Sequence, residues 1–290
     1  MLEMSGESEN SSLLRASLHT FAISDSISLK VCSSNDPQNL KIADLQKGLI
    51  LVCDGTDVIG EGIGFGVPIA KYSGETVFSG SSTLKVRKQE NVIEIRKEFL
   101  MDLIARDRFR NLKLENPKIR TLFDHISDLS HRHKRFARSI LIVKSLFFKF
   151  GVRSSFVSSP IKGSVIVTYM LYRNRILVKL NFCQLDRKNL GKIFVLNEQG
   201  AHFFSTYSDS EGLRLVDEEI GIWDDVTAQS ARIINEHNKI GFCLKHIEGS
   251  VLRRGREVME GFLDWIGLDY ELDAEHNHFE YEIELLGDES

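Results

Sequence analysis

The chain has few of the residues that cross-link or interrupt a fold. Only four cysteines and four prolines occur in 290 residues. No two cysteines form a C-x-x-C pair, and apolar residues surround each of them. We therefore expect buried free thiols in a reducing compartment and no zinc site. The four cysteines are Cys32, Cys53, Cys183 and Cys243.

Long apolar runs and an excess of one charge are also missing. The longest apolar stretch, residues 140–143, is soon interrupted by Lys144, so no membrane span is expected. Residues 1–12 are polar and acidic, lack the apolar core of a signal peptide and are predicted to be a disordered tail. A net charge of -4 gives no general attraction to nucleic acid or anionic membranes. These absences favour a cytoplasmic globular protein.

Alternating patterns predict β-structure on both sides of one helical segment. Residues 13–97 hold short runs of β-branched and aromatic residues, and residues 165–182 form two such runs around a turn. In the last run, residues 277–285, apolar and polar side chains alternate, so one buried face is expected. Residues 98–150 instead carry apolar residues at spacings of three and four, which predicts a helical pair.

The predicted fold class is α+β and predominantly antiparallel β: a large β-sandwich-like scaffold with a helical pair inserted at about 98–150. We expect residues 13–290 to form a single domain. A short helix is expected over residues 225–237, capped by Asp224 or Asp225. Residues 251–266 are ambiguous, because their apolar residues fit a helix while Gly255 and Gly261 disfavour one.

The most unusual feature is a run in which glycine takes every second position from 60 to 66. In an extended strand these glycines share one face, and glycine in a strand is costly. Two interpretations stand: close packing of the chain against itself, or a platform for a flat ligand that Gly62 and Gly64 contact. Lys71 and Tyr72, farther along the same stretch, are further candidates for ligand binding. Glu61 is the one charged residue of the run, and a buried carboxylate is paired or functional.

A second candidate lies in residues 197–204, where Asn-Glu-Gln-Gly-Ala-His separates two apolar runs. Functional residues favour such turns. Glu198 and His202 could act as a general acid/base pair. The alternative is a hairpin turn with exposed polar groups.

The third candidate is an indole beside carboxylates, at Trp223 and Asp224. Sugar sites use this combination, with a ring face on the tryptophan and hydroxyls on the carboxylate. A core tryptophan before a helix cap explains it equally well.

Other motifs are set aside. The glycine spacing is not G-x-G-x-x-G, and no Gly-Lys-Ser/Thr follows, so a dinucleotide or phosphate loop is excluded. Residues 276, 278 and 280 could ligate a metal, but no distant motif completes the set, and we expect no metal and no cofactor. A basic stretch over residues 131–138 fits the solvated face of a helix better than nucleic-acid binding.

The predicted function is that of a carbohydrate-binding or carbohydrate-modifying protein with a small, sugar-like ligand. If the protein is an enzyme, Glu61, Glu198 or His202 would carry out acid/base chemistry without a metal. The first alternative is a non-enzymatic protein that docks a protein partner through residues 98–150. The second is nucleic-acid binding through the basic residues 131–138, which the overall charge disfavours.

Overall fold

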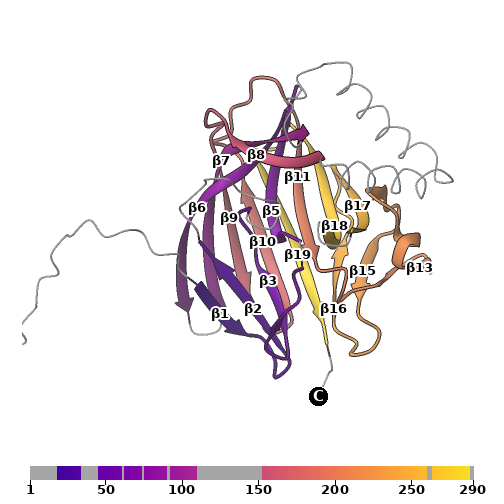
Figure 1. Ribbon diagram of the computed structural model, residues 1–290. Helices are drawn as coiled ribbons and strands as arrows, with labels where there is room; N and C mark the ends of the chain where they lie inside the picture. The colour runs from indigo at the N-terminus through magenta and orange to yellow at the C-terminus, as the bar shows by residue number, and fades with distance from the viewer. Residues whose placement is uncertain are drawn as a thin grey trace, which may run out of the picture.

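The computed structural model describes residues 18–33, 45–60, 62–73, 75–89, 92–109, 152–259 and 263–287 (Figure 1). Strands dominate these ranges, and one four-residue 3-10 helix, η3 (Asp217–Ile220), is the helical element within them. The strands are β1 (Leu18–Ala22), β2 (Ile27–Cys32), β3 (Ile50–Cys53), β4 (Thr56–Asp57), β5 (Gly64–Tyr72), β6 (Glu75–Gln89), β7 (Val92–Phe109), β8 (Val152–Ser158), β9 (Ser164–Leu171), β10 (Arg175–Asn181), β11 (Leu190–Gln199), β12 (Thr206–Asp209), β13 (Arg214–Val216), β14 (Asp224–Asp225), β15 (Ser230–Ile234), β16 (Gly241–Lys245), β17 (Ser250–Met259), β18 (Leu263–Asp273) and β19 (His278–Leu286).

The predicted fold class is wrong. The described chain is nearly all β, and its residues 98–109 belong to strand β7 instead of a helical pair. The misleading signal was local: Phe99, Leu103 and Ile104 fit a helical spacing, but Phe99, Met101 and Leu103 also fit a strand period and are buried. This segment is a strand because it pairs with β6 on one side and with β8 and β9 on the other. Residues 1–17 and 110–150 lie outside the described residues.

All strand pairs that join the described elements are antiparallel, and they form two sheets. A small sheet has the order β1-β2-β3-β4. A fifteen-stranded sheet has the order β13-β12-β15-β16-β19-β10-β9-β7-β6-β5-β11-β18-β17-β14, with β8 added beside β7.

The large sheet curves so that strands far apart in its order face each other. The Tyr169 hydroxyl on β9 donates to the Phe65 carbonyl on β5 at 2.9 Å. The Tyr281 hydroxyl on β19 donates to Asn197 Oδ1 on β11 at 2.5 Å. Phe65 also meets Phe242 of β16 edge to face, with ring centroids 5.0 Å apart. The main apolar core lies between the part of the sheet formed by β5 and β11 and the part formed by β9, β19 and β16.

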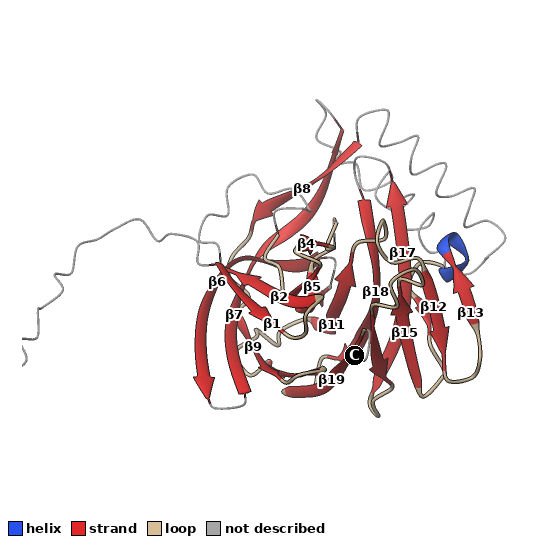
Figure 2. Cartoon of the chain, turned by 90° about the horizontal axis from the view of Figure 1, so that it is seen from below, coloured by secondary structure: helices blue, strands red, loops and turns tan. Residues whose placement is uncertain are grey.

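The small sheet lies between β7 and β11, as Figure 2 shows. Its Leu29 and Leu51 are fully buried in the main core. On one side Gln199 of β11 accepts from the Leu51 N–H at 3.3 Å. On the other side Lys97 of β7 donates to the Cys32 carbonyl at 2.6 Å. The small sheet is therefore hydrogen-bonded to both β11 and β7 of the large sheet.

Three local predictions can be compared with these strands. The hairpin at 165–182 is confirmed as β9 and β10, and the half-buried last strand is confirmed as β19. The predicted helix over 225–237 is wrong, because β14 and β15 occupy that segment. Of the ambiguous residues 251–266, residues 251–259 belong to β17 and residues 263–266 to its partner β18. Among the described residues, no helix has the length and apolar character needed to cross a membrane.

Candidate functional site

A largely buried cluster of carboxylates and aromatic rings lies on the face of β11, β18 and β17 opposite to the one that carries Ile266, Leu268 and Tyr270. On β18, Ile266, Leu268 and Tyr270 belong to the core, so the alternate residues point to the opposite face. The register places Glu198 of β11 opposite Gly267, and Gly267 opposite Gly255 of β17. We call this surface the site face; it holds Phe194, Glu198, Glu257, Trp265, Gly267, Asp269 and Glu271.

Two carboxylates, Glu198 and Asp269, lie in the interior of the site face. Glu198 is 6% exposed and Asp269 is 1% exposed. A Cβ atom on Gly267 would lie 3.0 Å from Glu198 Cγ and 2.8 Å from the Asn197 carbonyl oxygen. Glycine at this position therefore makes the room that the Glu198 side chain occupies.

Burial changes the proton affinity of both carboxylates. Loss of hydration raises the pKa of Asp269 to about 7, against a smaller lowering by the hydrogen bond from the Asn197 N–H. Loss of hydration, and then the neighbouring Asp269 charge, raise the pKa of Glu198 well above its usual value. Loss of hydration therefore favours the protonated form of both carboxylates, and the Asp269 charge adds to this effect at Glu198.

Further charges act on Glu198 from two directions. The Ile63 N–H donates to its carboxylate and the Lys47 ammonium attracts it, and both lower the pKa of Glu198. Glu257 of β17, itself 8% exposed, acts in the opposite sense and raises the pKa of Glu198. Lys47 also donates to the Gly62 carbonyl at 2.8 Å, which fixes its ammonium beside the residues 62–63.

The backbone around the pair is held from the core side by Asn197. The pairing of β11 with β5 shifts register between Leu196 and Asn197, as at a β-bulge. Asn197 Oδ1 accepts from the Tyr281 hydroxyl at 2.5 Å and from the Gly66 N–H at 3.0 Å. Its Nδ2 donates to the Leu268 carbonyl at 3.0 Å. These bonds fix the strand end that carries Glu198.

Two indoles lie at the site face, and the register places Trp265 opposite Glu257. Trp265 is 7% exposed and covers Gly255, where an added Cβ would lie 2.7 Å from Trp265 Cη2. Trp223 lies at a tilt to Trp265 with ring centroids 6.1 Å apart, and meets Phe194 edge to face at 5.7 Å. Trp223 has a φ of 59°, a backbone conformation uncommon for a bulky residue. Its indole remains partly exposed.

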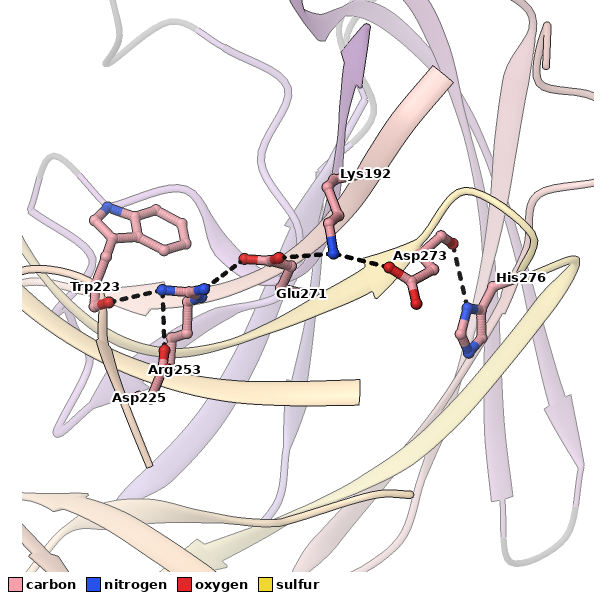
Figure 3. Close-up of polar contacts among 7 residues, drawn as sticks. All are labelled: Lys192, Trp223, Asp225, Arg253, Glu271, Asp273 and His276. Carbon is pink, nitrogen blue, oxygen red and sulfur yellow. Dashed lines mark hydrogen bonds and ion pairs between the residues drawn. The ribbon is translucent and has the colours of Figure 1, made fainter. Parts of the chain in front are cut away.

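A ladder of alternating charges continues along the same strands beyond the indoles (Figure 3). Arg253 pairs with Glu271 at 2.8 Å, Glu271 with Lys192 at 3.1 Å, and Lys192 with Asp273 at 2.8 Å. Arg253 also donates to the Trp223 carbonyl at 3.0 Å. The ladder therefore ties the segment that carries Trp223 to the site face.

Glu198 occupies a position different from the predicted one, whereas His202 lies exposed in a turn, as predicted. Residues 197–199 are not in an exposed turn but in the buried end of β11. His202 pairs through Nδ1 with Asp264, whose Oδ1 also accepts from the His202 N–H at 2.7 Å. The partner of Glu198 in the structure is Asp269 instead of His202. Glu61 lies outside the described residues.

The glycine run packs against the chain itself. β5 begins at Gly64, and Gly60, Gly64 and Gly66 have positive φ values, so the four glycines do not share one strand face. A Cβ on Gly62 would lie 3.0 Å from the Gln199 carbonyl oxygen, and one on Gly64 would lie 2.7 Å from the Leu49 carbonyl oxygen. The close-packing interpretation accounts for these positions.

The other predicted ligand contacts are dispersed. Lys71 and Tyr72 lie at the far end of β5, where Lys71 is exposed and the Tyr72 hydroxyl donates to the Asp186 carbonyl at 2.8 Å. Trp223 lies at the site face, as described above. Asp224 pairs with Arg254 at 3.4 Å on the neighbouring β17.

Sequence reasoning missed Asp269, Glu257 and Lys47. A signal for Asp269 was present, because residues 266–271 alternate between apolar positions and polar or glycine ones, which is typical of a strand. Its pairing with Glu198 depends on the register of two strands about seventy residues apart. Across the described ranges, no group of three or more His, Cys, Asp or Glu side chains could hold a metal ion.

Comparisons with known proteins give similarity of structure only. No protein-family model and no curated protein matches the sequence. The solved structures that match include the α-N-acetylgalactosaminidase NagBb from Bifidobacterium bifidum in complex with GalNAc, at a TM-score of 0.48 and 7% identity over 93% of this chain. This chain spans 36% of the length of NagBb. The Slr1438 protein from Synechocystis sp. PCC 6803 matches at a TM-score of 0.37 and 9% identity, over 97% of this chain and 100% of that one.

Proposed function

We propose that the protein binds a carbohydrate at the site face and that Glu198 and Asp269 act on it as an acid/base pair. The observation that carries this proposal is the buried Glu198–Asp269 pair with raised pKa values, next to two indoles. Perturbed pKa values cluster at functional sites, and a buried carboxylate pair of this kind is therefore a candidate site.

The ligand class follows from the groups at the border of the pair. An indole presents a flat apolar face to the C–H groups of a sugar ring, and carboxylates bind its hydroxyls. Trp223 is the partly exposed ring, and Glu198, at 6% exposed, is the more accessible carboxylate of the pair. We place the sugar ring against Trp223, with a hydroxyl or glycosidic oxygen toward Glu198.

The chemistry follows from the shared proton. Near neutral pH a pair of this kind holds one acid and one carboxylate, which are the two species that general acid/base catalysis needs. Transfer of a proton to a leaving oxygen by one group and removal of a proton by the other fits hydrolysis, epimerisation or elimination. His202 and Glu61, the other predicted acid/base residues, have no assigned step in this proposal.

A thermal-shift screen against neutral sugars, amino sugars and sugar acids tests the proposal. Binding to the folded state alone adds about 2.7 kcal/mol of stability at a hundredfold excess over Kd. We expect one sugar class to raise the melting temperature of the wild type and of the control Glu248→Gln, which changes an exposed carboxylate. The same sugar should have no effect on Glu198→Gln or Trp223→Ala.

The variants also separate a site residue from a structural one. Glu198→Gln keeps the shape of the side chain and removes a buried charge, so its own stability should hold or rise. Absence of a shift with every sugar on the wild type would contradict the proposal. A non-enzymatic structural or protein-interaction role would then be favoured, with the carboxylate pair as a part of the interior.

A further inference from the structure

A second buried charge, Lys97, lies behind the carboxylate pair. Lys97 is on β7 and is 0% exposed. Its ammonium donates to the Cys32 carbonyl at 2.6 Å and to the Lys47 carbonyl at 2.5 Å, and lies 5.0 Å from the Phe99 ring centroid. A buried ammonium is tolerated only when such acceptors replace water. Loss of hydration lowers the pKa of Lys97 to about 8.

One of its two acceptors belongs to the residue that acts on Glu198. The Lys47 backbone carbonyl binds Lys97, while the Lys47 side chain binds the Gly62 carbonyl and attracts the Glu198 carboxylate. The next residue, Gly48, donates to the Ile63 carbonyl at 2.8 Å. Ile63 in turn donates its N–H to Glu198. A continuous chain of contacts thus runs from Lys97 to Glu198.

We propose that Lys97 is a positioning residue for the site: by holding the Lys47 carbonyl it keeps the Lys47 ammonium at the Gly62 carbonyl, from where that ammonium attracts the Glu198 carboxylate. The consequence for catalysis rests on the proposed function. The positioning itself does not, because it concerns only how the carboxylates titrate.

The charged and titratable groups that face each end of this chain are few. Cys32 of β2 is the titratable neighbour that acts on Lys97. Asp269, Lys47 and Glu257 are the charged side chains that act on Glu198. Lys47 is the cation of that set, so displacement of its ammonium leaves the negative charge of Glu198 less well stabilised. The direction of the effect is therefore an increase in the pKa of Glu198.

A titration of the full chain with 13C-labelled carboxyl groups, without any sugar, tests the proposal. The Glu198 and Asp269 signals are assigned by their loss in Glu198→Gln and Asp269→Asn. We expect Lys97→Met to raise the Glu198 midpoint by about one pKa unit, and Lys47→Met to raise it by at least as much. In a Lys47→Met background, Lys97→Met should add no further shift, because the ammonium through which Lys97 is proposed to act is gone while the backbone contacts remain.

Two outcomes overturn the proposal. Either Lys97→Met leaves the Glu198 midpoint in place while stability falls, or it shifts the midpoint equally with and without Lys47. If Lys97→Met does not fold, Lys97→Gln keeps one donor for the carbonyls and must show a smaller shift in the same direction; an unchanged midpoint there also overturns it. Because no sugar is present, failure of the sugar screen leaves this result unaffected.

Discussion

Asp269 Oδ1 accepts a hydrogen bond of 2.7 Å from the backbone N–H of Asn197, at the register shift of β11. A backbone donor that the irregular strand pairing leaves available is thereby satisfied by a side chain from β18. The same contact places Asp269 next to the strand end that carries Glu198. Fold and candidate site therefore depend on one bulge.

The Asn197 side chain is expected to be a major contributor to stability. Asn197→Ala leaves the Tyr281 hydroxyl, the Gly66 N–H and the Leu268 carbonyl without this buried partner. Each lost buried partner costs about 1–3 kcal/mol, so the three together predict a loss of at least about 3 kcal/mol in the free energy of unfolding. Urea denaturation measures it, with the exposed Asn174→Ala as control. A loss equal to that of the control would refute this role.

The pH dependence of stability should reflect the raised pKa of the Asp269 carboxyl group. Asp269 has a folded pKa of about 7 against an ordinary value of 3.8, so the folded state holds its proton more tightly than the unfolded state. Its contribution is full below about pH 4 and is lost as pH rises through about 7. We expect Asp269→Asn to gain about 1–4 kcal/mol over the wild type at pH 8 and much less at pH 4.

Unfolding in urea at the two pH values measures this difference. The variant keeps an oxygen that can accept from the Asn197 N–H, so a change in shape is not introduced. A variant equally or less stable than the wild type at pH 8 would show that Asp269 is ionised there at no cost.

The close contact at Gly66 should make this position intolerant of a side chain. Gly66 has a φ of 74°, and an added Cβ would lie 2.8 Å from Tyr169 Cε1. Gly212 has a φ of 86° but no atom within 4 Å of its added Cβ. Both Gly→Ala changes carry backbone strain of about 1–2 kcal/mol, and Gly66→Ala must carry a steric cost as well. Equal melting temperatures for the two variants would rule out that steric contribution.

Thiol reactivity should distinguish the cysteines. Cys183 is exposed, with Sγ 3.7 Å from His278 Nε2, whereas Cys53 is buried. Burial raises the pKa of the Cys53 thiol to about 12, which leaves very little thiolate at neutral pH. We expect Cys183 to react first with a thiol reagent in the folded protein, as followed by mass mapping. Labelling of Cys53 before Cys183 would contradict the described fold in this region.

How far the sequence predicted this molecule depends on whether a signal was local. The strands at 165–182 and 277–285 follow from alternation, because side-chain direction in a strand is set residue by residue. The strand at 98–109 was not predicted, because the spacing of Phe99, Leu103 and Ile104 fits a helix locally. Pairing with distant strands makes this segment a strand. Glu198 was predicted as a candidate from its own neighbourhood. Its partners Asp269 and Lys47 were not, because only strand register and the path of the chain bring them together.

The most direct test of this account is the titration of Glu198 and Asp269 in the wild-type protein by 13C NMR of their carboxyl groups. The account predicts that the pair still holds a proton at pH 6, with the Asp269 midpoint near 7 and the Glu198 pKa well above its usual value. If both carboxylates instead titrate near pH 4, the pair is solvated and ordinary. The acid/base site proposed here would then be contradicted.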